Sequence, residues 1–320
     1  MLLVLTNSLD ATADYMLSHL LKASVPFLRL DTDSALSRIA LSYQDGKPAL
    51  KVDGHWYKPN DFTAVWYRRP ERLLLCNATD TPEGKCVLDE WSEALEGFLA
   101  HIPAAQWMNY PAANAQASKK LEQLSMAHTH GFLIPETIVT QDPEVLRNFF
   151  NTHNGEIIVK PMGRASVERP DDGCDSLIYT NRVRGSDIED LTDLPQCPTL
   201  FQQAIRKVSD IRITVVDADI HAVELIAKDA DGRQRCDIRR NNMQDVAYRM
   251  IDLPASAKSA VRNLMAFYGL RFAAIDMAKA ENDQWYFLEV NPNGQWAWLD
   301  LCAGMTIYKS FIASFSKEAV

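Results

Sequence analysis

Two apolar segments near the end of the chain, each carrying one acidic residue, constrain its fold more than any other feature. They are residues 272–278 (FAAIDMA) and 284–290 (QWYFLEV), and both have the length and composition of buried β-strands. The residues between them include Glu281-Asn282-Asp283, a combination typical of tight turns. The pattern therefore predicts an antiparallel β-hairpin with its turn centred between Asn282 and Asp283.

This predicted register brings oxygen-bearing side chains together. Asp276 would face Glu289, and position 274 would face Asn291. Facing residues in such a ladder have Cβ atoms about 4.5–5.5 Å apart. Glu289 and Asn291 share a face because they lie two residues apart on one strand. Two facing carboxylates destabilise a hairpin unless a cation compensates them, and oxygen ligands without histidine or cysteine suit Mg²⁺. We therefore predict a magnesium site at Asp276, Glu289 and Asn291.

A solvated hairpin face is the alternative explanation for these acids. Large apolar residues beside them favour a buried site, because such side chains are more often inside a protein than on its surface. These flanking residues are Phe272, Ile275, Phe287 and Leu288. The register depends on the turn, since a longer or bulged loop would shift the pairing.

The N-terminal part has the pattern of a parallel α/β unit. Residues 2–6 (LLVLT) form the pattern of a buried strand, apolar residues between Leu9 and Leu21 recur at helical spacing, and a second strand is expected at 25–30. The turn after the first strand lacks the G-x-G-x-x-G pattern, which argues against a dinucleotide-binding fold. Further strands are expected at 39–44, 49–52 and 64–67, and a helix at 86–101.

A domain boundary is expected between residues 102 and 112, where two prolines interrupt the periodicity. A helix should then run from about Asn114 to His130, with Gly131 after its C-cap. The segment 161–176, rich in Gly, Pro and Asp, has the composition of a mobile loop. Strands expected beyond the boundary are 156–160, a short one at Phe201, 211–216 and 220–227, and a helix is expected at 255–268.

Composition and charge are those of an ordinary globular protein. The chain has 320 residues, enough for two or three domains, and is 47% hydrophobic. Its formal net charge of −9 argues against a nucleic-acid partner. No segment has the length of a membrane span or the basic start of a signal peptide, so we expect no membrane association and a cytoplasmic location. The six cysteines lack metal-ligand or disulfide-framework spacing and are expected to be free thiols.

Several polar residues upstream of the hairpin are suited to binding phosphate. Lys160 ends an apolar strand beside the expected loop, and Lys120 lies on the helix before it, but each alone is better explained as an ordinary surface lysine. Asp210 and Arg212 share one strand face, and Arg239 follows in CDIRRNN. Arginine suits fork-like recognition of phosphate or carboxylate, although each arginine could instead belong to a structural ion pair.

The order of these features resembles the ATP-grasp superfamily over roughly residues 105 to 300. In sequence order they are Asn109, Lys120, GFLIPET at 131–137, IIVKP, FQQAI, DIRITVV, DIRRN, AIDM and LEVNPNG. More narrowly, AVWYRR at 64–69 and LEVNPNGQWAWLDL at 288–301 resemble the microviridin-type ribosomal-peptide maturases, also called graspetide synthetases. With these segments the resemblance covers nearly the whole chain, and LEVNPNGQW is its most specific part.

The resemblance implies an ATP-grasp fold of α/β and α+β type with an N-terminal pre-ATP-grasp domain. The implied domains are residues 1–105 for the N-terminal α/β domain, 106–195 for the central ATP-grasp subdomain and 196–320 for the C-terminal subdomain with the metal site. A precursor peptide with a leader segment is the implied partner, and a homodimer the implied assembly. One departure is KPMGRASVERPDDGCD, which has two glycines where many ATP-grasp ligases have a glycine-rich phosphate loop.

The resemblance also implies a mechanism with ATP and Mg²⁺ between two subdomains. The residues it assigns to ATP are Lys120 and Lys160 at the phosphates, Gln202, Gln203 and the backbone of Ile205 at adenine, and Asp210 at the ribose or as the partner of Arg212. A side-chain carboxylate of the peptide would become an acyl phosphate. A Ser or Thr hydroxyl or a Lys amine would then attack it and form an ω-ester or ω-amide ring. Arg212 and Arg239 would stabilise the acyl phosphate and the tetrahedral oxyanion.

The sequence is also compatible with three other functions. A ligase acting on free amino acids or a protein C-terminus would share nearly all of these residues. A nucleotide-binding regulatory protein belongs to a different class, and the intact set of acids, amide and arginines argues against it. A phosphotransferase would stop at a phosphorylated product. The sequence leaves open the choice between ester and amide, the precursor peptide, and the roles of Arg68 and Arg69, which either bind peptide acids or are structural at the domain junction.

Overall fold

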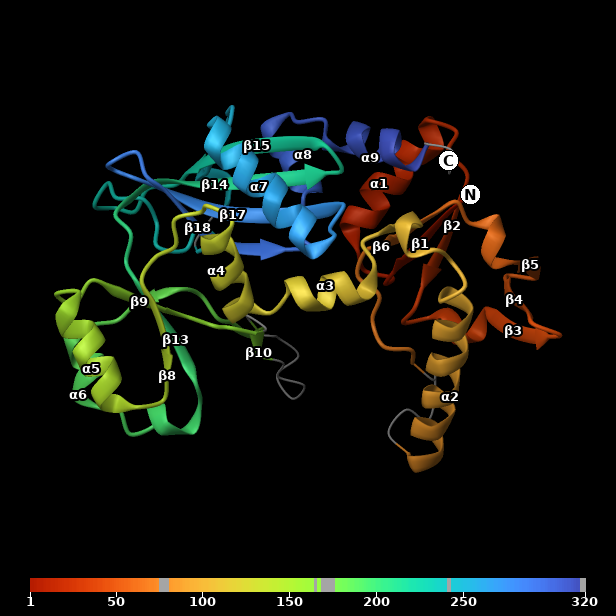
Figure 1. Ribbon diagram of the computed structural model, residues 1–320, viewed down its shortest axis with the longest axis horizontal. Helices are drawn as coiled ribbons and strands as arrows, with labels where there is room; N and C mark the ends of the chain where they lie inside the picture. Colours follow the sequence, from red (N-terminus) through yellow and green to blue (C-terminus); the bar gives the residue numbers. More distant parts are fainter. Residues whose placement is uncertain (75–80, 164–165, 168–175, 241–242, 317–320) are drawn as a thin grey trace.

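The computed structural model describes residues 1–74, 81–163, 166–167, 176–240 and 243–316. In Figure 1 the N-terminal sheet lies at the right, a five-stranded sheet at the upper left, and a four-stranded sheet below it. Parallel pairing is found in the N-terminal sheet, and antiparallel pairing in the other two. The predicted combination of α/β and α+β architecture is therefore confirmed.

The N-terminal part is built around a buried parallel sheet. Its strands, in spatial order, are β2 (Phe27–Asp31), β1 (Leu2–Thr6), β6 (Ala64–Tyr67) and β7 (Trp107–Met108). A small antiparallel sheet beside it consists of β3 (Ile39–Gln44), β4 (Lys47–Val52) and β5 (His55–Tyr57). The helices of this part are α1 (Ala11–Lys22) and α2 (Pro82–Leu99). The β-α-β opening predicted from apolar spacing is thus confirmed, with α1 crossing between two parallel strands.

The helix expected from Asn114 to His130 is in fact two helices, α3 (Pro111–Ala117) and α4 (Lys120–Thr129). The chain leaves the helical conformation at Lys119. The Ser118 hydroxyl donates to the Asn114 carbonyl oxygen at 2.7 Å and helps to end α3. Only the predicted C-terminal end, next to Gly131 with its positive φ of 95°, is as expected.

A side chain from α4 maintains this break and attaches the helix to a distant strand. The Gln123 amide nitrogen donates to the carbonyl oxygens of Ala117 at 2.6 Å and Val290 at 2.9 Å. Its oxygen accepts from the Val290 N–H at 3.2 Å. One buried glutamine therefore satisfies the end of α3 and holds α4 against the C-terminal sheet. As a consequence Lys120 is in the first turn of α4, close to that sheet.

The central sheet has the strand order β12, β9, β13, β8. Its strands and helices are β8 (Thr137–Thr140), α5 (Pro143–Thr152), β9 (Ile157–Lys160), β12 (Asn181–Arg182), α6 (Gly185–Glu189) and β13 (Thr199–Gln203). Two short strands, β10 (Ser166–Val167) and β11 (Ser176–Leu177), pair beside it. Most of the loop expected at 161–176 lies outside the described residues. Since β13 pairs with β8 and β9, the central sheet extends past the boundary proposed at 195/196, and the domain division stays a proposal.

The C-terminal sheet has the order β16, β15, β14, β17, β18. Its elements are β14 (Lys207–Val216), β15 (Asp219–Ile226), β16 (Ala247–Met250), α7 (Ala255–Tyr268), β17 (Phe272–Ala280) and β18 (Trp285–Asn291). Residues of α7 such as Leu264 pack in one buried cluster with Ile275 of β17. Only residues 204–206 separate β13 from β14, so the two sheets meet at this short connector.

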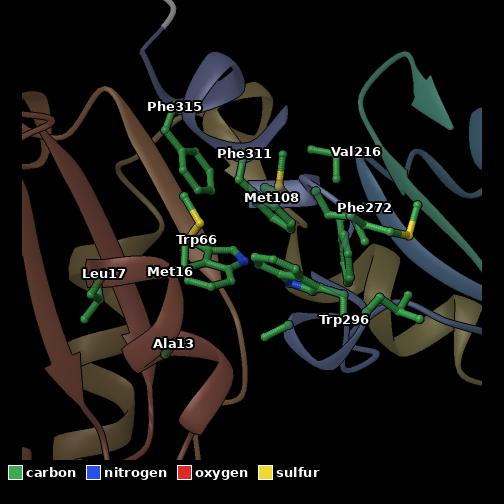
Figure 2. Packing of buried hydrophobic residues seen from close by; sticks show 14 of the residues in the cluster. Ala13, Met16, Leu17, Trp66, Met108, Val216, Phe272, Trp296, Phe311 and Phe315 are labelled. Carbon is green, nitrogen blue, oxygen red and sulfur yellow. The ribbon is translucent and has the colours of Figure 1, made fainter. Parts of the chain in front are cut away.

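The last two helices return to the N-terminal part and close the main core. They are α8 (Ala297–Ala303) and α9 (Ile307–Phe315). Phe311 is fully buried and stacks on Trp296 with ring centroids 4.6 Å apart. It also lies 5.5 Å from the rings of Trp66 on β6 and Phe272 on β17 (Figure 2). One aromatic side chain thus contacts both the N-terminal sheet and the C-terminal sheet. None of the described helices is long and apolar enough to cross a membrane.

Replacing Phe311 by alanine should destabilise the protein by about 3–5 kcal/mol, because it leaves a cavity between the N-terminal sheet and the C-terminal sheet. Urea unfolding followed by circular dichroism measures this loss. Phe267→Ala on α7 is the matched control, since Phe267 is 43% exposed, and should cost about 1 kcal/mol or less. Equal losses in the two variants would contradict the proposed role of Phe311 at this junction.

Candidate active site

A cleft of about 1330 Å³ is lined by residues from the central sheet and the C-terminal sheet. It brings together every residue that the sequence suggested for nucleotide, metal or catalysis. These are Lys120, Lys160, Gln202, Gln203, Ile205, Asp210, Arg212, Arg239, Asp276, Glu289 and Asn291. They come from α4, from the central and C-terminal sheets, from the connector between these sheets and from the loop after β15, so a shared cleft was not implied by sequence proximity.

The predicted facing pairs of the β17–β18 hairpin are confirmed. Asp276 faces Glu289, and Ala274 faces Asn291. Facing residues in an antiparallel ladder point to the same side of the sheet, as do residues two apart on one strand. Asp276, Glu289 and Asn291 therefore point together into the cleft, on the face opposite to buried Ile275.

The hairpin reaches this register by a different route from the one predicted. Lys279 faces Trp285, so the turn is centred on Asn282 rather than after it. Leu288 is then an extra residue in β18, where the ladder shifts by one position. Without this bulge, Glu289 would lie on the opposite face of the sheet, in the core. The turn is centred half a residue earlier than predicted, and the extra residue Leu288 restores the predicted pairing of Asp276 with Glu289.

Two cations from different elements compensate the facing carboxylates. Arg212 on β14 is the cross-strand neighbour of Asp276, and its Nη1 lies 2.8 Å from both carboxylate oxygens. The Lys120 ammonium lies 2.5 Å from Glu289 Oε2. The side chains of Asp276 and Glu289 remain 31% and 36% exposed. Both carboxylates are therefore held in place while still open to the cleft.

The two carboxyl groups differ in their proton affinity. Burial raises the pKa of Asp276, and the nearby Glu289 charge raises it further, although Arg212 opposes the change. Burial would also raise the pKa of Glu289, but Lys120 and Lys160 outweigh it and lower the pKa. Glu289 is accordingly the more readily ionised of the two carboxyl groups.

Lys160 provides a second ammonium group at the same end of the cleft. It ends β9, where it pairs with Leu200 of β13. Burial and the nearby Lys120 charge lower its pKa to about 8, while Glu289 and Asp276 oppose this shift. A desolvated ammonium of this kind gains most from an anion that enters the cleft.

The connector between the two sheets has polar groups that the fold does not satisfy. The backbone N–H and C=O groups of Ile205 make no hydrogen bond with the described residues. Gln202 is fully buried, its nitrogen donates to Thr137 Oγ1 at 2.8 Å, and its oxygen has no partner among the described residues. The Gln203 N–H already donates to the Glu136 carbonyl oxygen. Ile205 and Gln202 therefore suit a flat, hydrogen-bonding ligand better than the Gln203 backbone does.

Asp210 has partners that the sequence did not identify, whereas Arg239 makes the ion pair that was the alternative for it. Asp210 does not hold Arg212, which was one of its two expected roles. It accepts from the Lys207 ammonium at 2.6 Å and from the Gln234 amide at 2.9 Å. Arg239 makes two side-chain hydrogen bonds to Asp237, at 2.9 and 2.6 Å, which raise its pKa. Asp237 thereby holds the guanidinium of Arg239, which lines the cleft from the loop after β15.

The loop after β18 supports Arg212 from the N-terminal part. Arg68 is 1% exposed, and its Nε lies 3.2 Å from Asp10 Oδ2. Its other nitrogens donate to the Asn293 carbonyl oxygen at 2.5 Å and to Gln295 Oε1 at 2.6 Å. The Gln295 carbonyl oxygen in turn accepts from Arg212 Nη2 at 2.8 Å. Burial lowers the pKa of Arg68 to about 10, although Asp10 opposes it. Arg68 is therefore structural at the domain junction, which answers half of the question that the sequence left open.

Three residues with direct roles in this arrangement were not sequence candidates. They are Gln123, Lys207 and Gln295. Gln295 stands within LEVNPNGQW and could have been found there. Gln123 gave no local signal, because what defines it is a hydrogen bond to Val290, far along the chain. Lys207 pairs with Asp210 only three residues away, and that spacing could have suggested it.

The oxygen donors in the cleft fit Mg²⁺ bound together with a phosphate. Among the described residues, no group of three or more His, Cys, Asp or Glu side chains could hold a metal ion. The cleft instead provides the carboxylates of Asp276 and Glu289 and the amide of Asn291. Asn291 Oδ1 accepts one hydrogen bond, from the Asn293 N–H at 2.9 Å, and retains a second lone pair. Mg²⁺ commonly takes one or two protein carboxylates and completes its shell with water and substrate phosphates.

Comparisons with known proteins agree with this architecture. Residues 1–115 match the family of the MvdD pre-ATP grasp domain. The macrocyclase MdnB from Microcystis aeruginosa MRC is 27% identical, with a TM-score of 0.78 over 98% of both chains. A RiPP-associated ATP-grasp ligase from Chryseobacterium gregarium, in complex with ADP and a leader and core peptide, is 26% identical, with a TM-score of 0.82 over 99% of this chain and 98% of that one.

The macrocyclase MdnC from Microcystis aeruginosa MRC, bound with precursor peptide MdnA, has a TM-score of 0.84 over 99% of both chains, and at 23% identity it shows the fold alone. No curated protein matches the sequence. The predicted ATP-grasp fold with an N-terminal pre-ATP-grasp domain is thereby confirmed, and the roles of individual residues stay proposals.

Gly294 should tolerate no side chain. A Cβ at this position would lie 2.3 Å from Ala274 Cβ and 3.0 Å from Arg212 Nη2. Because Ala274 Cβ is fixed to its strand, Gly294→Ala should destabilise the protein by about 1–3 kcal/mol in urea unfolding.

The matched control is Gly97→Ala on α2, where a Cβ would meet nothing within 4 Å. In a helix this exchange should instead stabilise by about 0.5–1 kcal/mol. A Gly294→Ala variant as stable as the parent would show that the loop does not pack against β17 as described.

Proposed function

We propose that this chain, which joins an MvdD-type pre-ATP-grasp domain to an ATP-grasp fold, is an ATP-dependent ligase that closes rings in a ribosomally made precursor peptide. It activates an Asp or Glu side-chain carboxylate as an acyl phosphate. A Ser or Thr hydroxyl or a Lys amine of the same peptide then attacks, giving an ω-ester or ω-amide. The observation that carries the proposal is one cleft in which facing carboxylates, two lysines and two arginines converge.

The nucleotide is assigned to the end of the cleft between the two sheets. Lys120 and Lys160 would contact the phosphates, because both ammonium groups lie beside the acidic pair. Adenine would take the free backbone groups of Ile205 and the unpartnered oxygen of Gln202, which suits its exocyclic amino group. The relative from Chryseobacterium gregarium, which was solved with ADP, supports this nucleotide.

Asp276, Glu289 and Asn291 would hold Mg²⁺, which would neutralise charge on the transferred phosphoryl group. Once the phosphates are bound, the Lys120 ammonium could exchange Glu289 for a phosphate oxygen by rotation of its side chain, while α4 stays in place. Asp276 would keep Arg212 beside the reacting atoms. The residues of the chain thus rearrange little, so the site is preorganised for charge that develops during the reaction.

The reaction has two balanced steps. In the first, a carboxylate oxygen of the peptide attacks the γ-phosphorus, the bond to the β-phosphate oxygen breaks, and ADP leaves. In the second, the hydroxyl or amine attacks the carbonyl carbon, inorganic phosphate leaves, and the nucleophile gives up one proton. Arg212 and Arg239 would stabilise the acyl phosphate and the oxyanion from two sides of the cleft. Positioning the nucleophile is then the main remaining task.

Co-expression with short acidic peptides encoded beside the gene tests this proposal. Each ring should remove one water from the peptide, a loss of about 18 Da in mass spectrometry that follows from joining an acid to an alcohol or amine. Glu289→Gln should lower the rate by about 10²–10³, because the site loses one anionic metal ligand worth several kcal/mol. Glu93→Gln, an exposed change on α2, should leave the rate unchanged.

Other results would point to the other functions. Phosphate release with free amino acids and no peptide would favour a ligase for small substrates. A stable phosphorylated peptide without water loss would indicate a phosphotransferase. Full biological activity of Glu289→Gln would favour a regulatory protein without turnover. The homodimer implied by the family resemblance stays a prediction.

Nucleotide binding should take up protons near pH 8.5. Lys160 has a pKa of about 8 in the free protein, so it is mostly neutral there, and phosphate charges would raise this pKa towards its ordinary value. Binding of a non-hydrolysable ATP analogue should then take up a proton, up to about one, and none near pH 6.5, where Lys160 is already charged. Calorimetry in buffers of different ionisation enthalpy measures the uptake.

Lys160→Met should abolish the uptake, and Lys119→Met, which alters an exposed neighbour of Lys120, should retain it. An unchanged uptake in Lys160→Met would remove Lys160 from the phosphate site.

A further inference from the structure

Arg69 is a cation in the cleft that has no anionic partner among the residues that the structure describes. It follows Arg68 at the end of β6 and is partly buried. Its Nε donates to the Asn293 carbonyl oxygen at 3.1 Å. Its guanidinium makes no ion pair and no other hydrogen bond with the described residues. Its two terminal nitrogens are therefore available to something that enters the cleft.

The charges around Arg69 leave one guanidinium in excess. The nearby charges of Arg69 and Arg212 both lower the pKa of Arg68. Asp10 is 4% exposed and already binds Arg68 and two backbone N–H groups at the start of α1. Asp276 is bound by Arg212. Burial lowers the pKa of Arg69, and Arg212 lowers it further, although Asp10 opposes this. An incoming anion would offset this cost of burial.

Arg69 and the lysines are held by different parts of the structure. Arg69 donates to the Asn293 carbonyl oxygen, and Arg212 donates to the Gln295 carbonyl oxygen of the same loop after β18. Arg212 also binds the Asp276 carboxylate. Lys120 binds Glu289 on β18 itself, and Lys160 ends β9. The two arginines therefore share one loop, whereas the lysines, which the proposed function assigns to phosphates, come from other elements.

We propose that Arg69 is a specificity residue of this site and receives the peptide side-chain carboxylate that is to be activated. The inference rests on the proposed function, which supplies an acidic peptide and an activation step. A guanidinium presents two parallel N–H donors that match a carboxylate. Arg69 would hold the carboxylate beside Arg212, which is held by the same loop after β18. This role completes the answer left open for the Arg68-Arg69 pair: the first is structural, and the second binds substrate.

A binding cycle tests the proposal directly. The probe is the peptide that loses water in the co-expression experiment, labelled with a fluorophore, and the same peptide with its reacting Asp and Glu residues changed to Asn and Gln. The parent enzyme should bind the acidic form about tenfold more tightly, the order expected for one hydrogen-bonded charge pair. In Arg69→Met this ratio should fall to about one, because the charge that reads the carboxylate is gone.

Two further variants separate substrate binding from a structural role. Arg69→Lys keeps the charge but loses the fork, so it should give an intermediate ratio with a melting temperature close to that of the parent. Arg38→Met removes an exposed arginine of the same domain that pairs with Asp53, and should keep the full ratio. In steady-state kinetics Arg69→Met should raise KM for the peptide about tenfold and leave KM for ATP unchanged.

Each outcome decides the matter. A ratio that persists in Arg69→Met overturns the inference, as does a rise in KM for ATP alone, which would assign Arg69 to a phosphate. A ratio of one in the parent enzyme overturns it as well. If the parent enzyme modifies the peptide in any of these cases, the proposed function stands and only Arg69 loses its role. If no peptide loses water, the proposed function fails and this inference fails with it.

Discussion

Two carboxylates that face each other on neighbouring strands are the constraint on which the rest of this structure depends. Asp276 and Glu289 would repel across the β17–β18 ladder, and the fold compensates them with Arg212 from β14 and Lys120 from α4. This compensation requires a cross-strand arginine and a helix that begins beside the sheet. In the proposed function, a metal and nucleotide phosphates take over part of it. The same charges that would bind the nucleotide therefore organise the cleft.

The N-terminal part supports this site through the loop after β18. Arg68 holds the loop after β18, Gln295 passes that support to Arg212, and Gly294 lets the loop lie against β17 without a clash. Phe311 seals the same junction with apolar contacts. Arg68 and Arg69 are adjacent on one strand end, but they point to different tasks because one is sealed in the core and the other lines the cleft.

Local patterns predicted most elements and failed where distant contacts decide. The apolar strands and α7 were found because burial imposes a period on the sequence. The helix expected from 114 to 130 is broken, and Gln123 maintains the break by binding both the end of α3 and Val290, far along the chain. The hairpin turn was placed half a residue late, and the bulge at Leu288 could not be read from composition. Asp210 was expected to bind Arg212, two residues away, whereas it binds Lys207, three residues away, and Gln234, 24 residues away.

The sequence by itself determined the fold class, the acidic hairpin and the kinds of residue available for phosphate and metal chemistry, because these follow from periodicity and from residue type. Only the tertiary structure decided which of these residues share a cleft and which side chains keep free polar groups there. Arg68 and Arg69 show the difference: identical in chemistry and adjacent in sequence, they are separated by burial and by their partners. Those are properties of packing between segments more than two hundred residues apart, which no local pattern contains.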